Sequence, residues 1–240
     1  MNHTDRSHSY FKDYTQNPPK NINYNAYNKE TQRDSSGRNI GNEEFRNEQL
    51  EGRIKDIETI KIYLESAQEE FKHIDMEKLS IIGHSFGALT AIEACYKDKN
   101  SFKLCAVMDI YFSGRASKIL NSSDYVINQP IFINRSEYFK KSPFLNDHDH
   151  EACNNKFFED TCKHNKKKNY NVELTATGHC GQLDVSMLMP GAMSAIKMVG
   201  PQDQVCDKLM ENHGSILAFM SENGVLPIKF DKTVDEIVKS

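Results

Sequence analysis

One pentapeptide carries the strongest chemical signal in this sequence. Gly83-His84-Ser85-Phe86-Gly87 follows the apolar residues 79–82 and precedes apolar residues at helical spacing, namely Ala88, Leu89, Ala91, Ile92 and Ala94. Gly-x-Ser-x-Gly between a strand and a helix is typical of a nucleophile elbow, whose sharp turn requires Gly83 and Gly87 on either side of the serine. We predict that Ser85 is a catalytic nucleophile. The alternative is an ordinary serine in a strand–turn–helix connection.

The residue after the serine has a predicted role as well. A helix that begins after Ser85 directs its first backbone N–H groups towards the serine hydroxyl. The amide of Phe86 can then donate a hydrogen bond to the oxyanion of a tetrahedral intermediate, which lowers the barrier to acyl transfer. We therefore expect Phe86 to be one donor of an oxyanion hole.

Two further residues complete a predicted catalytic triad. A serine hydroxyl needs an imidazole base, and the base needs a carboxylate that fixes its tautomer. In hydrolase folds these groups follow the serine in the order acid, then histidine, each just beyond a strand. Asp109 directly follows the apolar run 104–108, and His179 follows the run 172–176. We predict that Asp109 is the acid and His179 the base.

Other residues compete for these roles. Glu137 follows another apolar run and is the alternative acid. His84 neighbours the nucleophile, but in an elbow this side chain points away from the hydroxyl, and we expect it to be structural. The remaining alternatives have weaker claims: the histidines of a hydrophilic segment as bases and one cysteine as nucleophile, namely His148, His150, His164 and Cys180.

The elements that position these residues follow from the apolar pattern. Four runs of strand length (79–82, 104–108, 130–133 and 172–176) are separated by helical or loop sequence, which predicts an α/β fold with a mostly parallel sheet and flanking helices. From Arg46, an amphipathic helix is predicted to pack on this sheet through Leu50, Ile54, Ile57, Ile60 and Leu64. The apolar, Met-containing residues 183–189 and 202–220 predict core helices, the second in two pieces that break near Gly214, with a lipid-facing surface as the alternative.

Two segments lack such periodicity. Residues 1–45 are polar, and we predict a disordered tail before a domain at 46–240. Residues 147–168 contain several His and Cys residues, but their spacing matches no zinc template, so we predict a solvated insertion loop, and no metal or cofactor.

Composition narrows the partners and the compartment. The net charge of −4 and the pI near 6.1 give no reason to expect nucleic acid. No long apolar run and no signal peptide are visible, so we expect a cytoplasmic protein, or a secreted one if the true N-terminus lies upstream. Six scattered cysteines suit reduced thiols.

The sequence resembles the platelet-activating factor acetylhydrolases, which are serine lipid esterases of α/β-hydrolase fold. The similarity runs from about Asp5 to the C-terminus. Its strongest pieces are Arg46-Asn47-Glu48-Gln49, Ile82 to Gly87, Met108-Asp109, Gln129 to Asn134, Ser136-Glu137-Tyr138-Phe139 and Gly178-His179.

The resemblance implies roles and a substrate. It places the nucleophile on Ser85, the acid on Asp109 rather than Glu137, and the base on His179. It also implies calcium-independent hydrolysis of a short or oxidised acyl chain from the sn-2 position of a phospholipid, on a lipid surface.

The sequence also departs from the family. Ala88 replaces a glycine, and Cys180-Gly181-Gln182 alters the histidine loop. The family's N-terminal strands and second oxyanion donor are expected to be missing, which would leave residues 79–82 as an apolar sheet edge. The alternative function is therefore a truncated, weakly active or inactive homologue that acts as a binding partner.

Overall fold

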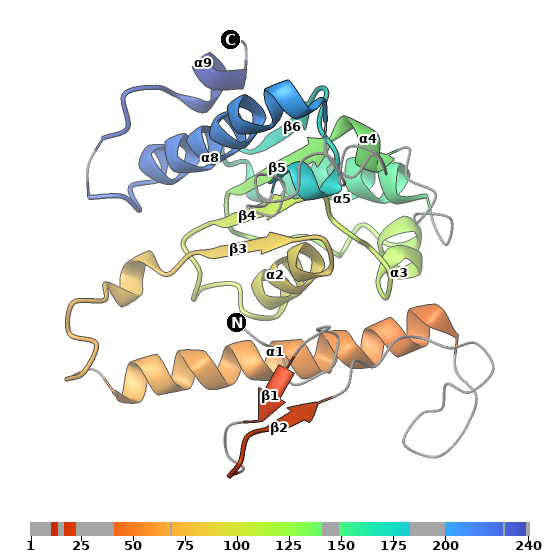
Figure 1. Ribbon diagram of the computed structural model, residues 1–240. Coiled ribbons are helices and arrows are strands. Elements are labelled where there is room, and N and C mark those ends of the chain that lie inside the picture. Colours follow the sequence, from red (N-terminus) through yellow and green to blue (C-terminus); the bar gives the residue numbers. More distant parts are fainter. Residues whose placement is uncertain are drawn as a thin grey trace. The chain divides into compact units, whose positions relative to one another are not determined.

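The computed structural model describes residues 11–13, 17–22, 41–67, 69–140, 149–182, 200–227 and 229–238. The chain divides into two units, one comprising Met1–Ile74 with Ser113–Ser117 and the other comprising Asp75–Phe112 with Lys118–Ser240. Figure 1 labels their elements. Each unit is described by itself.

The first unit contains a short hairpin and a long helix. Strands β1 (Phe11–Asp13) and β2 (Lys20–Ile22) pair antiparallel. Helix α1 (Asn42–Ser66) has two glutamates in its first turn, where the helix dipole favours negative charge. The guanidinium of Arg115 donates to Asn47 and, over 2.8 Å, to Glu51 of this helix.

The structure changes the predicted start of the first helix. It begins at Asn42 rather than Arg46, and β1 and β2 lie inside the range predicted as a tail. Residues 1–10, 14–16 and 23–40 lie outside the described residues, where the disordered tail stays a prediction. The apolar stripe is buried at Leu50 and Ile54, but Ile60 is 38% exposed, so the stripe is not buried along its whole length.

The second unit is built on a four-stranded parallel sheet, as predicted. Its strands are β3 (Ile81–His84), β4 (Cys105–Met108), β5 (Ile131–Ser136) and β6 (Tyr170–Leu174), in that spatial order. The register places Gly83 beside Val107, and Val107 beside Ile133. Strand β3 is an edge of the described sheet and exposes Ile82 by 48%, as expected for an apolar edge. The carboxyl ends of all four strands lie at one edge, where α/β folds bind their ligands.

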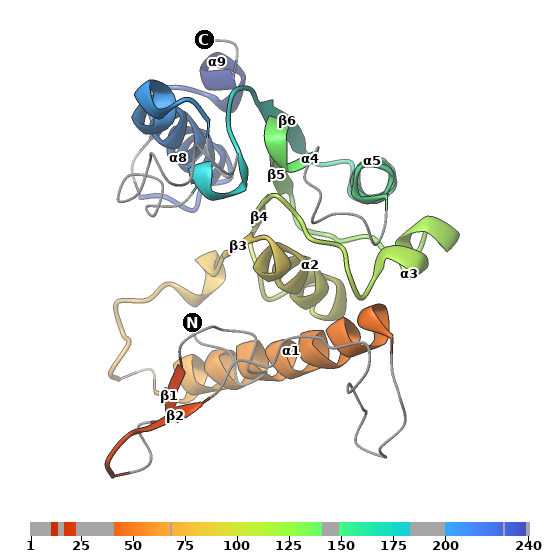
Figure 2. The ribbon, with the colours of Figure 1, turned by 45° about the vertical axis from the view of Figure 1, so that its right-hand side comes forward.

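Helices cover both faces of this sheet (Figure 2). One face carries α2 (Phe86–Lys97) and α5 (His150–Asn165), and the other carries α8 (Val205–Glu222) and α9 (Val234–Val238). Short elements complete the unit: η1 (Met76–Lys78), α4 (Glu137–Lys140), η3 (His179–Gln182), η4 (Gln202–Gln204) and α3 (Ala116–Asn121), which crosses the division between the units.

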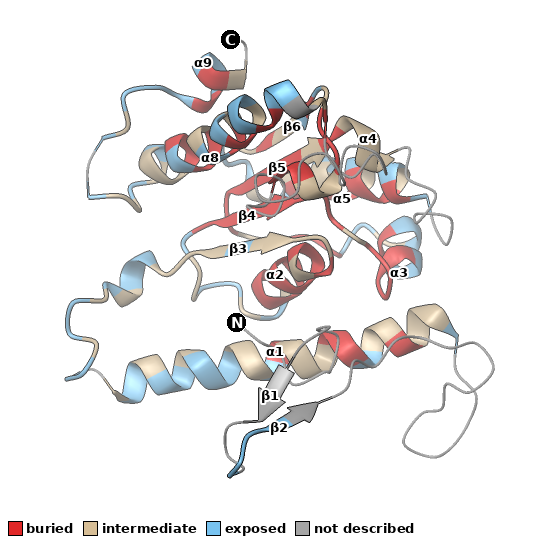
Figure 3. Ribbon diagram, in the orientation of Figure 1, coloured by how far each residue is buried: buried red, intermediate tan, exposed pale blue. Residues whose placement is uncertain are grey.

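The buried residues of this unit include most of the central strands and of helix α2 (Figure 3). All four residues of β4 are buried, which explains its continuous apolar sequence. On the α8 face, Phe132 packs against Phe219 with ring centroids 5.6 Å apart. On the α5 face, Tyr125 packs against Phe157 at 5.9 Å. The core therefore fixes the strand ends from both sides.

Two sequence-based predictions in this unit are wrong. The predicted insertion loop at 147–168 is largely helix α5, which buries Cys153 and Phe157; its charged residues hid the apolar face. Helix α8 is continuous through Gly214 instead of breaking there, because a single glycine inside a helix costs only about 1 kcal/mol relative to alanine and does not by itself end the helix. Residues 183–189 lie outside the described residues, so the core helix there stays a prediction.

Among the described helices, none combines the length and the apolar character needed to span a bilayer.

Candidate active site

Ser85 occupies the turn between β3 and α2 in a strained backbone conformation. Its φ and ψ are 58° and −123°, in a region that L residues rarely adopt. The turn is held because the Ser85 N–H donates to the carbonyl of Met108 at 2.9 Å, and the Ser85 carbonyl accepts from the amides of Ala88 and Tyr111. The neighbouring strand β4 therefore holds Ser85 at the carboxyl edge of the sheet.

The two elbow glycines differ in what the turn demands of them. A Cβ added to Gly83 would lie 2.3 Å from the carbonyl oxygen of Gly87, so Gly83 must lack a side chain. An added Cβ at Gly87 would meet no described atom within 4 Å. The prediction that both positions require glycine therefore has a steric reason at Gly83, whereas the described atoms leave room for a side chain at Gly87.

Phe86 is the first residue of α2. This is the position that the predicted oxyanion donor requires, because the first N–H groups of a helix point beyond its N-terminal end. The Phe86 ring packs edge-on against Tyr111, with centroids 6.4 Å apart, and its carbonyl accepts from the Thr90 hydroxyl at 2.9 Å. The geometry is compatible with the predicted role.

Asp109 lies immediately beyond β4, with a fully buried carboxylate. Its backbone φ is 46°, and its N–H donates to the carbonyl of Asn134 at 2.9 Å. The Ser136 backbone N–H donates to Oδ1 and the Ser136 hydroxyl to Oδ2, both at 2.6 Å. These bonds compensate the desolvation of a buried negative charge.

His179 joins this carboxylate from the opposite side. Its Nδ1 lies 3.2 Å from Asp109 Oδ2, so Nδ1–H donates to the acid and Nε2 remains for a substrate or nucleophile. The imidazole lies between two rings: Phe139 stacks on one side at 4.2 Å and 11°, and His84 lies at 4.3 Å and 31°. The predicted acid and base are thus brought together and oriented.

His84 holds the base in place. Its Nε2–H donates to the backbone carbonyl of His179 at 2.9 Å, since a carbonyl only accepts. Burial lowers the pKa of His84 to about 4, and the neighbouring His179 lowers it in the same direction. His84 therefore stays neutral at pH 7. The prediction that it is structural agrees with this contact, although the sequence did not show which residue it would hold.

His84, Asp109 and His179 also form the one described cluster whose ligand atoms would suit a metal ion, since these atoms lie within 4.8 Å of one another. However, His84 Nε2 is bonded to a carbonyl and both Asp109 oxygens accept from Ser136. These hydrogen bonds fit an acid–base pair, Asp109 and His179, that His84 and Ser136 hold in place.

The competing residues lie in other environments. The Glu137 carboxylate accepts from the backbone N–H of Ala176 at 2.9 Å, so it braces the turn before His179. His150 Nδ1 accepts from the Phe112 amide, and His164 Nε2 contacts Asn128. Burial, and then the charge of Asp109, raise the pKa of the Cys180 thiol, which disfavours a thiolate nucleophile. His148 lies outside the described residues.

Two supporting residues were missed by the sequence analysis. Ser136 supplies two of the hydrogen bonds to Asp109, and Gln182 Nε2 donates to the Ser136 hydroxyl at 2.6 Å. Ser136 stands at the end of β5, next to the end of β4 where Asp109 lies, so its position in the sequence could have indicated a contact with Asp109. Gln182 had none, because its role depends on the fold of the histidine loop.

A parallel sheet with a strained serine between its edge strand and a helix, and an Asp–His pair at the same strand ends, defines the chain as an α/β-hydrolase. The sequence profile of the family described as platelet-activating factor acetylhydrolase, isoform II, matches residues 1–239. The chain belongs to this family, and membership supports a lipid esterase function. The comparison with curated proteins gave no significant match.

Proposed function

We propose that this protein is a serine esterase that cleaves the sn-2 acetyl ester, or a short or oxidised acyl ester, of platelet-activating factor and related phospholipids. Ser85 is the nucleophile, His179 the base and Asp109 the acid. The observation that carries the proposal is the hydrogen bond of His179 Nδ1 to Asp109 Oδ2, at the same strand ends as the strained Ser85. The substrate class is supported by family membership.

Acylation begins with proton transfer from the Ser85 hydroxyl to His179 Nε2, as Oγ bonds to the ester carbonyl carbon. Asp109 stabilises the imidazolium through Nδ1–H, and the Phe86 amide donates to the oxyanion. When the intermediate collapses, the ester C–O bond breaks and the lysophospholipid oxygen takes the proton from His179. The products of this half-reaction are the acyl-serine and a lysophospholipid.

Deacylation repeats these steps with water. His179 takes a proton from water as the hydroxide oxygen bonds to the acyl carbon. The second tetrahedral intermediate then releases the short carboxylic acid, and Ser85 Oγ recovers the proton. His84 stays neutral during the cycle, so the imidazolium of His179 has no second positive ring beside it.

The direct test measures acetate released from the acetylated ether phospholipid. Ser85→Ala is expected to lower kcat by about 10⁴-fold or more, because no other group replaces the nucleophile. Ser80→Ala is the matched control, since Ser80 lies just before the same strand and its hydroxyl bonds the carbonyl of Lys78. Full activity of Ser85→Ala would contradict the proposal.

An active-site phosphonate separates this enzyme from an inert binding homologue. Labelling that is lost in Ser85→Ala but kept in Ser80→Ala supports a reactive serine. Absence of labelling in the folded wild-type chain supports the non-catalytic alternative.

A further inference from the structure

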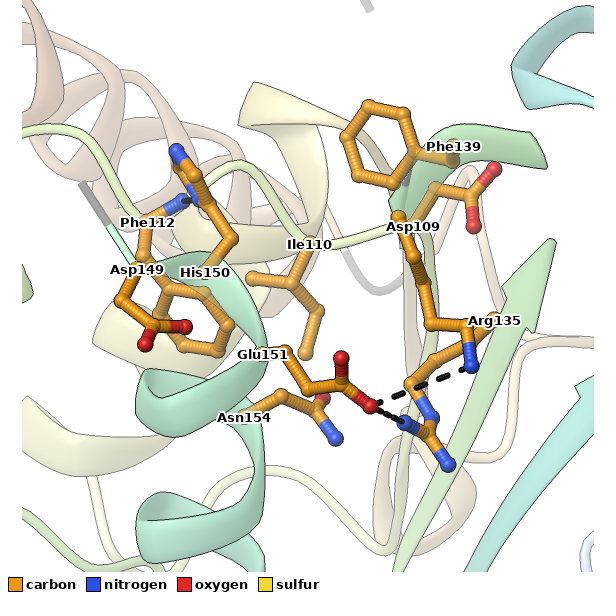
Figure 4. A pocket seen from close by; sticks show the side chains of 10 residues that line it. Asp109, Ile110, Phe112, Arg135, Phe139, Asp149, His150, Glu151 and Asn154 are labelled. Atoms are coloured by element: carbon orange, nitrogen blue, oxygen red, sulfur yellow. Dashed lines mark hydrogen bonds and ion pairs between the residues drawn. The ribbon is translucent and has the colours of Figure 1, made fainter. Parts of the chain in front are cut away.

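A cavity of about 170 Å³ opens beside the predicted acid, between the end of β5 and the start of α5. Figure 4 shows its charged side chains facing one another across it. Asp109 and Phe139 line the cavity, and the same Phe139 ring stacks on His179 at 4.2 Å. The cavity therefore adjoins the Asp–His pair, although the catalytic steps above do not use it.

One wall of the cavity carries the guanidinium of Arg135, which is weakly paired. The Arg135 side chain is 18% exposed, and its closest ionic contact is 3.7 Å, from Nη1 to Glu151 Oε1. Its Nε is buried and has no hydrogen-bond partner among the described residues. Burial of a charged donor without hydrogen bonds is unfavourable, so this position is suited to an anionic oxygen ligand.

A second cation lies next to Arg135. Lys140 Nζ is 2.5 Å from Glu173 and 3.8 Å from Glu151, and its side chain is 22% exposed. Glu151 lies within 4 Å of both cations, and its side chain is 54% exposed. Contacts of 3.7 and 3.8 Å are longer than hydrogen bonds, so an incoming anion can displace Glu151 at small cost.

We propose that Arg135 and Lys140 bind the phosphodiester group of the glycerophospholipid substrate. This assignment rests on the proposed function. A guanidinium offers paired N–H donors that match phosphate oxygens. In a glycerophospholipid the phosphate is attached to the glycerol carbon next to the one that carries the sn-2 ester, so an ester at the Ser85–His179 site places the phosphate nearby. Phe139 joins the two sites, because it lines the cavity and stacks on His179.

The kinetic test compares two substrates. The ratio of kcat/KM for the acetylated ether phospholipid, as monomers, to kcat/KM for p-nitrophenyl acetate reports phosphate recognition apart from ester chemistry. Arg135→Gln is expected to lower this ratio about 10- to 100-fold, the usual worth of a hydrogen bond to a charged group. Arg135→Lys is expected to recover part of the loss.

Two further variants leave Arg135 in place, so they test the proposal even if the Arg135 variants misfold. Glu151→Gln removes the competing acid from a largely exposed side chain, so the ratio is expected to rise severalfold. Lys163→Gln is the matched control, because Lys163 lies on the same helix α5 and pairs with Glu159 and Asp160. It is expected to leave the ratio unchanged.

Calorimetry supplies a readout that needs no turnover. Wild-type protein is expected to bind glycerophosphocholine, a soluble phosphodiester, more tightly than inorganic phosphate, and Arg135→Gln is expected to lose this binding. If the wild type hydrolyses neither ester, the proposed function fails, while Arg135-dependent binding of glycerophosphocholine would still support a phosphodiester site.

Several results would overturn the inference. An equal fall for both substrates in Arg135→Gln would assign the residue to general structure. Equal or tighter binding of inorganic phosphate would indicate a general anion site rather than a headgroup site. A lower ratio in Glu151→Gln would show that the acid assists binding instead of competing with it.

Discussion

Asp109 and Glu137 are two carboxylates that follow neighbouring strands, yet they have different environments. Asp109 follows β4, is fully buried and accepts hydrogen bonds from Ser136 and His179. Glu137 follows β5, is half-buried and accepts from the backbone N–H of Ala176. One carboxylate contacts the base, and the other braces the loop that carries it.

This difference shows what a position at a strand end can and cannot establish. Both residues satisfy the sequence rule for the acid, because both stand beyond the carboxyl end of a parallel strand. The direction of each side chain and its hydrogen bonds decide between them. The following variants test this division of roles, beginning with the largest expected effect.

Asp109→Asn should lower kcat by about 10⁴-fold, because an amide no longer fixes the imidazole tautomer or stabilises the imidazolium. The measurement is kcat at pH 7, with thermal unfolding as the folding control. An activity within tenfold of the wild type would mean that another carboxylate acts as the acid.

Ser136→Ala removes the hydroxyl that donates to Asp109 at 2.6 Å while keeping the backbone N–H bond. Loss of a hydrogen bond to a buried charge should lower the free energy of unfolding by about 2 kcal/mol and kcat by about 10- to 100-fold. Denaturant unfolding and acetate release check the two effects. Ser80→Ala serves again as the control, and equal effects in both variants would contradict the role of Ser136.

His84 should make stability depend on pH, because its pKa is about 4 in the folded protein. Between pH 7 and pH 5 the unfolded histidine, with a pKa near 6.5, takes up a proton that the folded protein excludes. The unfolded state is therefore favoured on acidification, by about 2 kcal/mol over this interval for this one group. Urea unfolding at pH 7 and at pH 5 should show that the free energy of unfolding depends less on pH in His84→Asn than in the wild type. An equal change in the free energy of unfolding with pH in both proteins would contradict this role of His84.

Glu137→Gln should have the smallest effect, because the amide oxygen can still accept from Ala176. We expect kcat to stay within about tenfold of the wild-type value. This loss is smaller than the one expected when a hydrogen bond to a charged group is removed. Acetate release measured beside Asp109→Asn checks the comparison. If Glu137→Gln lost as much activity as Asp109→Asn, the two roles would be reversed.

The strands were predictable because parallel strands buried on both faces are apolar runs, as residues 104–108 illustrate. Helix α5 was not predictable in the same way. It has as many charged residues as buried ones, and Cys153 and Phe157 are recognised as a core face only when α5 packs against the sheet. The Arg135 cavity was also invisible in the sequence, because its walls come from β5, α4, α5 and the segment after β4.

The sequence by itself determined the elbow, since the steric requirement at Gly83 and the strand–serine–helix order are local properties of a few consecutive residues. It also determined the order of serine, acid and histidine. Only the tertiary structure decided which carboxylate meets His179 and that His84, Ser136 and Gln182 hold the pair. Hydrogen bonds between residues 27 to 95 positions apart depend on strand register and loop conformation, which no local pattern encodes.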